Sequence, residues 1–279
     1  MAGGEEIVST GLNEILAECS LDNRLLILSI MGDKPISVAD VRRALRDAGA
    51  QKSYTTVKRY MVALKKIGLV DEKRKHFFLT NLGTYVASTF SEMCLNIEVL
   101  KSRAKAMRLL SISCLPQRFM HGIKALKHAE YVPDPFSFIT EFFVRIQESE
   151  SSIALLSDKV SRRFYELIVK KVAEGVEYRG INSSENTSRR MEYVSRMVEG
   201  LGIHGEELQK FRARCRMREH DSVPMHIIVV DGRIAGINFP YRDGRANLNG
   251  AFVSQKREFV SWAEEILNYF WEESREVEF

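Results

Sequence analysis

The sequence predicts an α+β protein whose first third is mainly helical and whose remainder alternates helices with strands. Two observations predict this class. A helical apolar period followed by a short hairpin occupies 53–83, and a strand, helix, strand succession begins near 152. The 279 residues suffice for two domains that each bury a core without metal or disulfide support. We therefore expect a small helical domain ahead of a larger domain built on a mixed sheet.

Residues 53–68 are predicted to form an amphipathic helix with a defined start and end. Ser53 is a suitable N-cap, because its hydroxyl can accept from an amide of the first turn. Gly68 ends the helix, since glycine adopts the left-handed C-cap conformation without a steric penalty. One face repeats apolar residues: Val57, Met61, Leu64 and Ile67. The opposite face is polar and basic: Thr55, Thr56, Lys58, Arg59, Lys65 and Lys66.

A β-hairpin is predicted directly after this helix. Leu69 and Val70 open one strand, a charged tip at 71–75 turns the chain, and 76–80 returns as the second strand. Upstream, a helix is expected over 7–30, broken near 20–22, and another over 38–48 that Ser37 caps. Helix, helix, polar helix and hairpin is the element order of a winged helix-turn-helix.

The motif LKKIGLV followed by FFLTNLG resembles the winged helix-turn-helix of MarR-, PadR- and TrmB-type transcriptional regulators. Those families end the helix as L-x-x-x-G-L-[VI] and return the wing as Y-x-L-T-x-x-G. Leu79, Thr80 and Gly83 match directly, and Phe77 stands at the aromatic position. The resemblance covers about the first third of the chain and implies double-stranded DNA as a partner.

Charge is concentrated around this motif. Between 34 and 75 there are twelve basic residues and four acidic ones, a net +8, although the whole chain carries only +4. An α-helix fits the major groove, and cations beside it neutralise phosphates. We expect groove contacts from Thr55, Thr56, Lys58 and Arg59, and a phosphate or capping role for Ser53. Lys65 and the wing residues Lys73, Arg74 and Lys75 are expected to make further DNA contacts. Arg42, Arg43 and Arg46 are expected to contact phosphate. The alternative is that these charged side chains form the water-exposed faces of surface helices and make no DNA contact.

The helix expected over 84–106 occupies the place of the dimer helix in MarR- and PadR-like proteins, so the resemblance implies a homodimer. A second recognition helix would also extend the number of base pairs read. Residues 99–129 contain seven basic residues and no acidic one. They form either a second surface beside DNA or a cradle for the acidic C-terminal end, where seven glutamates and one arginine lie within 258–279. The predicted organisation is a DNA-binding domain at 1–83, a linking helix at 84–106 and a sensing or dimerisation domain at 107–279.

Within 107–279 the periodicity predicts a series of strands and helices. Strands are expected at 107–115, 151–157, 176–181 and 211–218, and a hairpin is expected at 225–239 that turns at Asp231-Gly232. Strand, helix, strand over 151–181 favours a parallel pair. Helices are expected at 116–127, 136–146, 158–174, 186–201 and 256–273, the last of them burying Phe259, Ile266, Leu267 and Phe270 with Trp262 at its margin.

The C-terminal segments VPMHIIVVDGRIAGINFPYRDG and EFVSWAEEILNYFW resemble the C-terminal domain of archaeal regulators of the methanogenesis-regulator and TrmB-like kind. That domain is related to the phospholipase D fold, whose chemistry requires H-x-K-x-x-x-x-D. Counting from His226, the lysine position holds Ile228 and the aspartate position holds Arg233. The resemblance therefore implies a non-catalytic sensor or dimerisation module rather than an enzyme.

A small-molecule effector, if one binds, is expected where strands of the α/β sheet end near helix N-termini. The candidate residues are Ser157, Asp158, Asn182, Ser183 and Ser184, with ordinary helix capping as the alternative. Arg212 and Arg214 begin an arginine ladder that ends at 218; it would hold an anion or DNA phosphate, or protect an exposed strand. No cofactor and no metal are expected, because His121 and His128 are too far apart to bind one ion without further ligands.

We expect a cytoplasmic, nucleoid-associated protein without a membrane partner. The four cysteines are widely spaced, no apolar run is long enough to cross a bilayer, and the first residues lack the composition of a signal peptide. The preferred function is a sequence-specific DNA-binding transcriptional regulator. The alternatives are a winged-helix protein-interaction module of a transcription or replication assembly and, less favoured, a phospholipase-D-like phosphodiesterase or nuclease.

Overall fold

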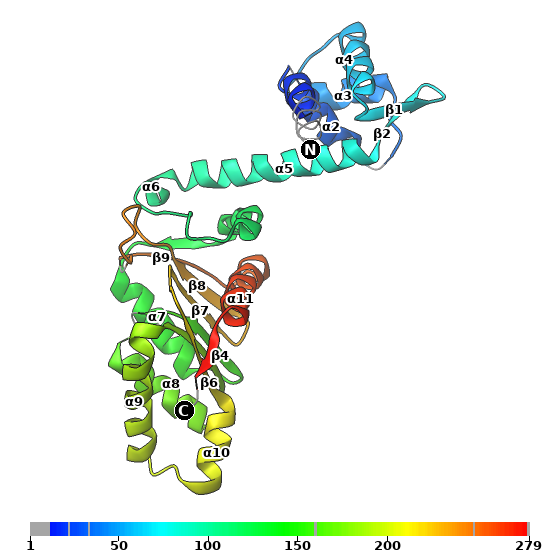
Figure 1. Ribbon diagram of the computed structural model, residues 1–279. Helices are drawn as coiled ribbons and strands as arrows, with labels where there is room; N and C mark the ends of the chain where they lie inside the picture. The colour runs from blue at the N-terminus through cyan, green and yellow to red at the C-terminus, as the bar shows by residue number, and fades with distance from the viewer. Residues whose placement is uncertain (1–11, 22, 33, 159–160, 248, 278–279) are drawn as a thin grey trace, which may run out of the picture. The chain divides into compact units, whose positions relative to one another are not determined.

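The computed structural model describes residues 12–277 apart from 22, 33, 159–160 and 248. It confirms the predicted α+β class. The chain divides into two compact units, Met1–Ile97 (unit 1) and Glu98–Phe279 (unit 2). The division falls inside the long helix α5 (Asn81–Ser102), which Figure 1 shows in cyan and green. Each unit has a hydrophobic core of its own.

Unit 1 begins with helices whose boundaries the local sequence sets. Residues 12–19 are helical and a turn follows at 20, where the break was predicted; residues 7–11 of that expected helix lie outside the described residues. Three helices follow: α2 (Arg24–Met31), α3 (Val38–Asp47) and α4 (Tyr54–Lys66). Ser37 caps α3 by accepting from the Asp40 amide at 3.2 Å, and Ser53 caps α4 by accepting from the Thr56 amide at 3.1 Å. Both predicted N-caps are confirmed.

The wing consists of β1 (Val70–Lys73) and β2 (His76–Leu79), which pair antiparallel. Ile36 and Phe77 exchange two backbone hydrogen bonds of 2.8 and 2.9 Å, which adds a third, short strand to the pair. Arg74 and Lys75 turn the hairpin with φ of 53° and 66°, the values of a type I′ turn. Unit 1 is thus a winged helix, as predicted.

Hydrogen bonds of Thr80 and the close packing of Gly83 hold the end of the wing against the start of α5. The Thr80 hydroxyl donates to the Gly68 carbonyl at 2.6 Å and accepts from the Gly83 amide at 3.0 Å. A Cβ on Gly83 would lie 1.8 Å from the Leu69 carbonyl oxygen, so only glycine fits there. The single helix expected over 84–106 is instead α5 and the short α6 (Ala104–Met107), separated at Arg103, whose guanidinium donates to the Ala129 carbonyl.

Unit 2 is built on one mixed sheet of eight strands in the order β10-β6-β5-β4-β7-β8-β9-β3. Strands β4, β5 and β6 run parallel, so the parallel pair predicted for 151–181 is confirmed; the other pairs are antiparallel. The strands are β3 (Glu130–Val132), β4 (Ser152–Leu156), β5 (Glu177–Ser183), β6 (Cys215–His220), β7 (His226–Val230), β8 (Ile234–Asn238), β9 (Ala251–Ser254) and β10 (Arg275–Val277).

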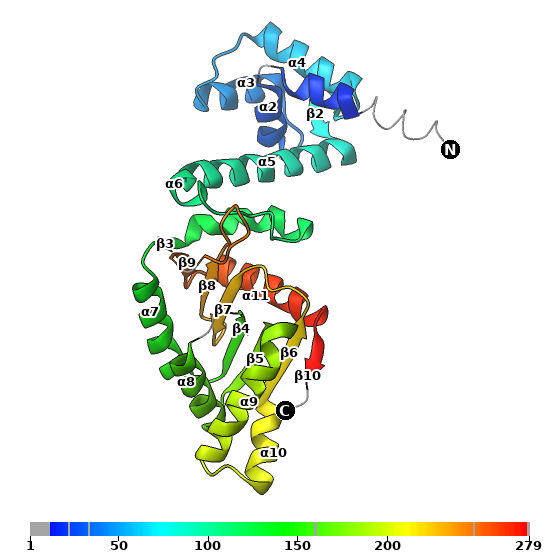
Figure 2. The same ribbon diagram turned by 60° about the vertical axis from the view of Figure 1, so that its left-hand side comes forward.

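Helices cover both faces of this sheet (Figure 2). On β7, Ile227 and Val229 enter one core while Ile228 and Val230 enter the other, which is the two-residue alternation of a strand buried on both sides. The first face carries η1 (Gln117–His128, a 3₁₀ helix) and α11 (Arg257–Glu272). The second carries α7 (Pro135–Gln147), α8 (Arg162–Ala173), α9 (Ser184–Gly200) and α10 (Gly205–Arg214).

The predicted hairpin at Asp231-Gly232 is confirmed, with φ of 53° and 62° at the two residues. The Asp231 carboxylate also accepts hydrogen bonds from the amides of Glu150, Ser151 and Ser152 at 2.8–3.0 Å. The turn residue that closes the β7–β8 hairpin therefore fixes the start of β4 as well.

Two strand predictions are wrong. Residues 107–115 form no strand; Leu110 makes one isolated bridge with Tyr241, and Leu110 and Leu115 are buried in loops against the sheet core. Residues 211–218 divide between α10 and β6, so Arg212 and Arg214 lie in the last helical turn and only Arg216 and Arg218 lie on a strand. Phe211 and Cys215 are four residues apart, a spacing that suits both the helical and the strand period, and this coincidence produced the apparent ladder.

The contact between η1 and α11 consists of rings and backbone. Trp262 is buried, not marginal as predicted; its indole N–H donates to the Phe119 carbonyl at 3.2 Å, and a Cβ on Gly122 would lie 2.2 Å from its ring. The Arg118 guanidinium lies 3.9 Å from the centre of the Tyr269 ring. Of the basic residues of 99–129, Arg118 thus contacts α11 through a cation–π interaction.

Candidate nucleic-acid interface and ligand cavities

The outer face of α4 carries the residues that were predicted from the sequence to contact the groove. Thr55, Lys58 and Arg59 are exposed, and Thr56 is half-buried. The Ser53 hydroxyl lies 2.9 Å from the Thr56 hydroxyl and accepts from the Thr56 amide, so Ser53 has the capping geometry among its two predicted roles. Because Val57, Tyr60, Met61 and Leu64 are buried on the other side, the orientation of this face is fixed by the core.

Some of the predicted phosphate contacts are already paired with carboxylates. Arg43 lies 3.3 Å from Asp40, Arg46 lies 3.6 Å from Asp47, and Lys65 lies 3.3 Å from Glu72. Among the described residues, six other predicted basic contacts form no ion pair, and we call them the unpaired basic set: Arg42, Lys58, Arg59, Lys73, Arg74 and Lys75. All six are exposed.

Helix α5 carries an exposed apolar face. At 100° per residue, Leu82, Tyr85, Met93 and Ile97 lie within about 120° of the helix circumference. Their exposed fractions are 44, 71, 44 and 47%. We call these four residues the apolar face of α5, the segment that the sequence nominated for dimerisation.

The predicted ligand residues in unit 2 are largely engaged in holding the fold. Asn182 and Ser157 are buried, the Ser183 amide donates to Asp158 at 2.6 Å, and the Ser184 hydroxyl accepts from Arg275 at 3.3 Å. Arg214 lies beside Gly175, and Arg212 is on the same helical turn, so neither joins this group.

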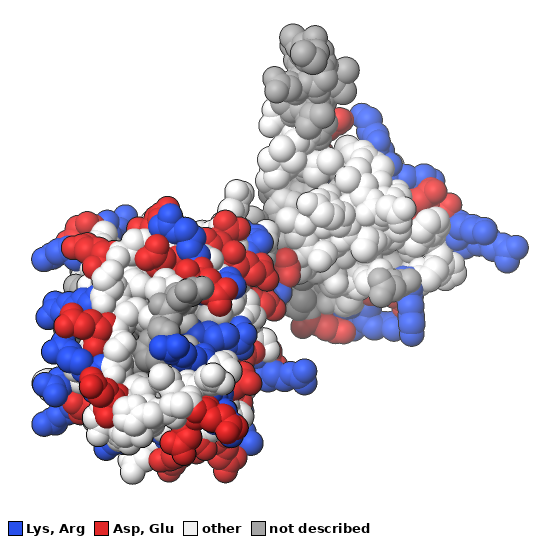
Figure 3. All heavy atoms as spheres, turned by 60° about the horizontal axis from the view of Figure 1, so that its bottom comes forward, with Lys and Arg blue, Asp and Glu red and all other residues white. Residues whose placement is uncertain are grey.

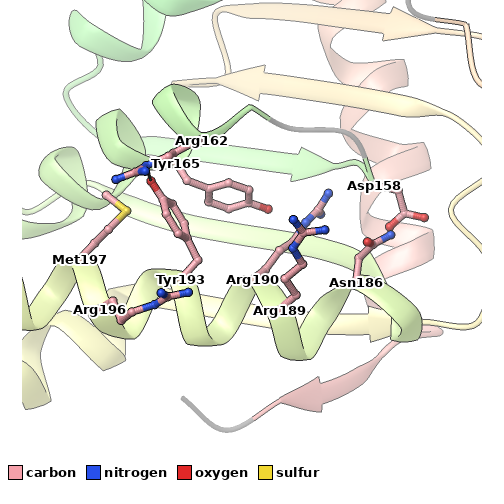
Figure 4. A pocket seen from close by; sticks show the side chains of 9 residues that line it. All are labelled: Asp158, Arg162, Tyr165, Asn186, Arg189, Arg190, Tyr193, Arg196 and Met197. Carbon is pink, nitrogen blue, oxygen red and sulfur yellow. Dashed lines mark hydrogen bonds between the residues drawn. The ribbon is translucent and has the colours of Figure 1, made fainter.

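One cavity, of about 590 Å³, lies between α8 and α9 and is lined by arginine and tyrosine; we call it the arginine cavity (Figure 4). Arg190, which is only 8% exposed, points across it toward Tyr165 and donates to the Ser157 carbonyl and the Asn182 side-chain oxygen. Burial raises the pKa of Tyr165, while the nearby Arg190 opposes that rise. The lining residues are Asp158, Arg162, Tyr165, Asn186, Arg189, Arg190, Tyr193, Arg196 and Met197.

Two of the other three arginines that line this cavity have partners, while Arg189 is exposed and forms no ion pair within the described residues. Arg162 donates to Glu166 at 3.0 Å and to the Tyr193 hydroxyl at 2.8 Å. A hydrogen bond from Tyr193, aided by Arg162, lowers the pKa of Glu166. Arg196 lies 3.3 Å from Glu192. Figure 3 likewise shows Lys and Arg interspersed with Asp and Glu on unit 2, unlike the net +8 of 34–75.

A second cavity, of about 530 Å³, lies between α7 and strands β4, β7 and β8; we call it the apolar cavity. Ser157 and His226 stand at one side, with 2.5 Å between the Ser157 hydroxyl oxygen and the His226 Nδ1. The sequence did not pair them, although both flank buried strands that proved to be neighbours. The lining residues are Pro135, Phe136, Phe138, Ile139, Leu155, Ser157, Ser161, Phe164, His226, Ile227, Ile228, Asn238, Asn247 and Asn249.

Two of the three positions of the phospholipase-D motif line the apolar cavity, and the third, Arg233, does not. His226 is present, but Ile228 occupies the lysine position and is buried among apolar side chains. Across the described residues no group of three or more His, Cys, Asp or Glu is arranged to hold a metal ion. None of the described helices combines the length and apolar content that crossing a bilayer requires.

Comparison with known proteins relates part of unit 2 to a family. Residues 135–273 match the family described as methanogenesis regulatory protein FilR1, middle domain. Among solved structures, TrmBL2, an archaeal chromatin protein with a novel mode of DNA binding, has a TM-score of 0.42 and 12% identity over 92% of this chain and 95% of its own. The phospholipase D family member Nuc from Salmonella typhimurium has a TM-score of 0.36 and 11% identity over 54% of this chain and 97% of its own. No curated protein matches the chain. The segment that carries α7 to α11 is therefore similar to the middle domain of the methanogenesis regulatory protein FilR1.

Proposed function

We propose that this chain is a transcriptional regulator that binds double-stranded DNA through unit 1. The family match at 135–273 supports a regulatory role. The observation that carries the proposal is the unpaired basic set, which lies on α3, on the exposed face of α4 and on the wing of a winged helix. Cations without carboxylate partners are available to neutralise phosphates.

The geometry of unit 1 suits insertion of α4 into the major groove. Thr55, Lys58 and Arg59 are exposed on one side of a helix of 13 residues whose other side is held by the core. Hydroxyl and cationic side chains reach base edges there, and the wing residues 73–75 would neutralise phosphates or enter the neighbouring groove. Val62, exposed on the same helix, would contact a thymine methyl group.

The proposal includes a homodimer and an effector. One recognition helix reads few base pairs, so a second copy would raise specificity. The apolar face of α5 is the surface that we assign to contact between copies, because exposed apolar faces of this kind mark interaction sites. Unit 2 would bind a small effector and alter DNA binding, which fits a domain that is similar to part of a regulatory protein.

Measuring duplex affinity against salt concentration tests the DNA-binding role. Each neutralised phosphate contributes a slope of about −0.9 to log K against log salt. We expect a steep fall for the wild type and, for Lys58→Ala/Arg59→Ala, a loss of about 10–100-fold together with a shallower slope. The matched control, Arg196→Ala/Lys210→Ala, removes two exposed charges from unit 2 and should leave affinity unchanged. Affinity that is indifferent to salt would overturn the proposal.

A protein-docking role for unit 1 is the second candidate. Tyr54 and Val62 of α4 are 49 and 53% exposed, which suits a protein partner as well as a DNA groove. In that case the purified protein would ignore duplex DNA, and Val62→Lys would abolish capture of the partner while Lys58→Ala/Arg59→Ala would not.

A further inference from the structure

We propose that the apolar cavity of unit 2 binds a neutral small molecule that combines a flat apolar body with a hydroxyl donor. This inference deepens the effector role in the proposed function and rests on it for its regulatory meaning. The binding itself is a property of unit 2 and requires no DNA. The walls, the floor and the charge of the cavity each contribute to this assignment.

The walls of the apolar cavity suit a flat apolar body. Phe136, Phe138 and Phe164 contribute rings from α7 and α8, and Leu155 and Ile228 contribute aliphatic side chains from the sheet. Phe138 and Phe142 pack with ring centres 4.9 Å apart, which fixes the position of the Phe138 ring. A cavity of about 530 Å³ with mainly apolar walls and a few fixed polar groups is typical of a small-molecule site.

The charge of the lining points to a neutral ligand. Among the described residues that line the apolar cavity there is no Lys, Arg, Asp or Glu. An ion that entered would lose hydration without gaining a counter-charge, so charged ligands are disfavoured. The arginine cavity differs in this respect, but three of its four arginines are already bonded, to Glu166, Glu192, Asn182 and the Ser157 carbonyl.

The floor of the apolar cavity holds a polar group that lacks a partner. Asn238 is 5% exposed, and its amide nitrogen donates to the Gly250 carbonyl at 2.8 Å. Its side-chain oxygen is buried and has no hydrogen-bond partner within the described part of the chain. Buried acceptors are nearly always satisfied, so an acceptor without a partner on a residue that lines a cavity suits a hydrogen-bond donor of a ligand. A ligand hydroxyl would supply it.

Ser157 and His226 provide a second polar position in the same cavity. The hydrogen bond of 2.5 Å between them fixes both side chains. Asn247 also donates to the Gly250 carbonyl, at 2.9 Å, so two lining asparagines, Asn238 and Asn247, are held by the same carbonyl. The polar groups are thus positioned before a ligand arrives, which reduces the entropy lost on binding.

The test is ligand-observed NMR with 4-ethylphenol on the full chain without DNA. 4-Ethylanisole, which has no donor, and 4-ethylbenzoate, which carries a charge, serve as comparison compounds. Ile139→Trp fills the cavity from its rim, where Ile139 is 46% exposed and the fold tolerates a larger side chain. Asn238→Ala removes the orphan acceptor, and Arg196→Ala in the arginine cavity is the control.

We expect 4-ethylphenol to bind at millimolar concentration, about 10-fold more tightly than 4-ethylanisole, because only the phenol satisfies a buried acceptor. Ile139→Trp should abolish binding, Asn238→Ala should remove the preference for the phenol, and Arg196→Ala should bind as the wild type does. Absence of binding to the wild type, equal binding of 4-ethylanisole, tighter binding of 4-ethylbenzoate or undiminished binding by Ile139→Trp would overturn the inference. Loss of DNA binding in other variants would not overturn the inference, since the ligand-binding assay contains no DNA.

Discussion

Ser157 and His226 are 69 residues apart in the chain and share a hydrogen bond of 2.5 Å. The antiparallel pairing of β4 with β7, with Leu156 opposite Ile227, brings them together. A polar pair is thereby placed in a mainly apolar cavity, whose lining also includes the buried Ile228.

Replacing Ser157 with alanine should destabilise unit 2. The change leaves His226 without this hydrogen bond in a partly buried site, at an expected cost of about 1–2 kcal/mol. Chemical denaturation followed by far-UV circular dichroism measures the loss. Ser113→Ala removes an exposed serine hydroxyl and should cost less than about 0.5 kcal/mol. Equal stability of Ser157→Ala and the wild type would contradict the structural role of the pair.

Asp231→Asn should show a pH-dependent loss of stability. Hydrogen bonds from the amides of Ser152, Glu150 and Ser151 outweigh partial burial and hold the pKa of Asp231 below its usual value. The ionised carboxylate therefore stabilises the fold above the unfolded pKa, and this contribution is lost as pH falls through the folded pKa.

We expect Asp231→Asn to cost about 1–2 kcal/mol at pH 7, and the difference from wild type to narrow below about pH 4. Asparagine tolerates the positive φ of this turn, so the backbone is not an additional cause. Urea denaturation at several pH values measures the profile, with the exposed Glu199→Gln as control. A difference independent of pH would contradict the assignment to the carboxylate.

Gly83→Ala should disrupt unit 1. The new Cβ would lie 1.8 Å from the Leu69 carbonyl oxygen, and a backbone atom cannot yield as a flexible side chain can. We expect a loss of more than about 2 kcal/mol, or a displaced wing, seen by calorimetry and by amide NMR shifts. Gly200→Ala meets no atom within 4 Å and lies in a helix, so it should be neutral or slightly stabilising.

Substitutions at the turn of the wing test the stability of unit 1 and the role of the wing's charges independently. Arg74 and Lys75 adopt positive φ, a conformation that Asn and Gly favour. Arg74→Asn/Lys75→Gly should therefore raise the thermal stability of unit 1 while lowering DNA affinity through the loss of two cations. Arg74→Lys/Lys75→Arg keeps both charges and should keep the affinity. If the uncharged variant binds DNA as tightly as the wild type, the wing has no role in binding.

Tyr85→Lys/Met93→Lys should convert a dimer into a monomer. Two charges on the apolar face of α5 would be buried without partners if copies met there. Sedimentation velocity measures the change, and Ser88→Lys, on another side of the same helix, is the control. A dimer that survives both changes would place the contact elsewhere.

Features that depend on residues close together in the chain could be predicted without the structure. Ser37 and Ser53 were identifiable as N-caps, and Asp231-Gly232 as a hairpin turn, because a cap or a tight turn is made by residues within a few positions of each other. Helical and strand periods gave the winged helix and the parallel pair for the same reason.

The strand order, and with it the position of the cavities, depends on long-range packing and could not be predicted from local patterns. The spacing of the apolar residues Phe211 and Cys215 suits a helix and a strand alike. Packing against α8 and the sheet therefore determines where α10 ends and β6 begins. Ser157, His226 and Asn238 meet because β4, β7 and β8 are neighbours in the sheet, and no local pattern encodes which strands pair. Long-range pairing is fixed by burial of both faces of the sheet at once.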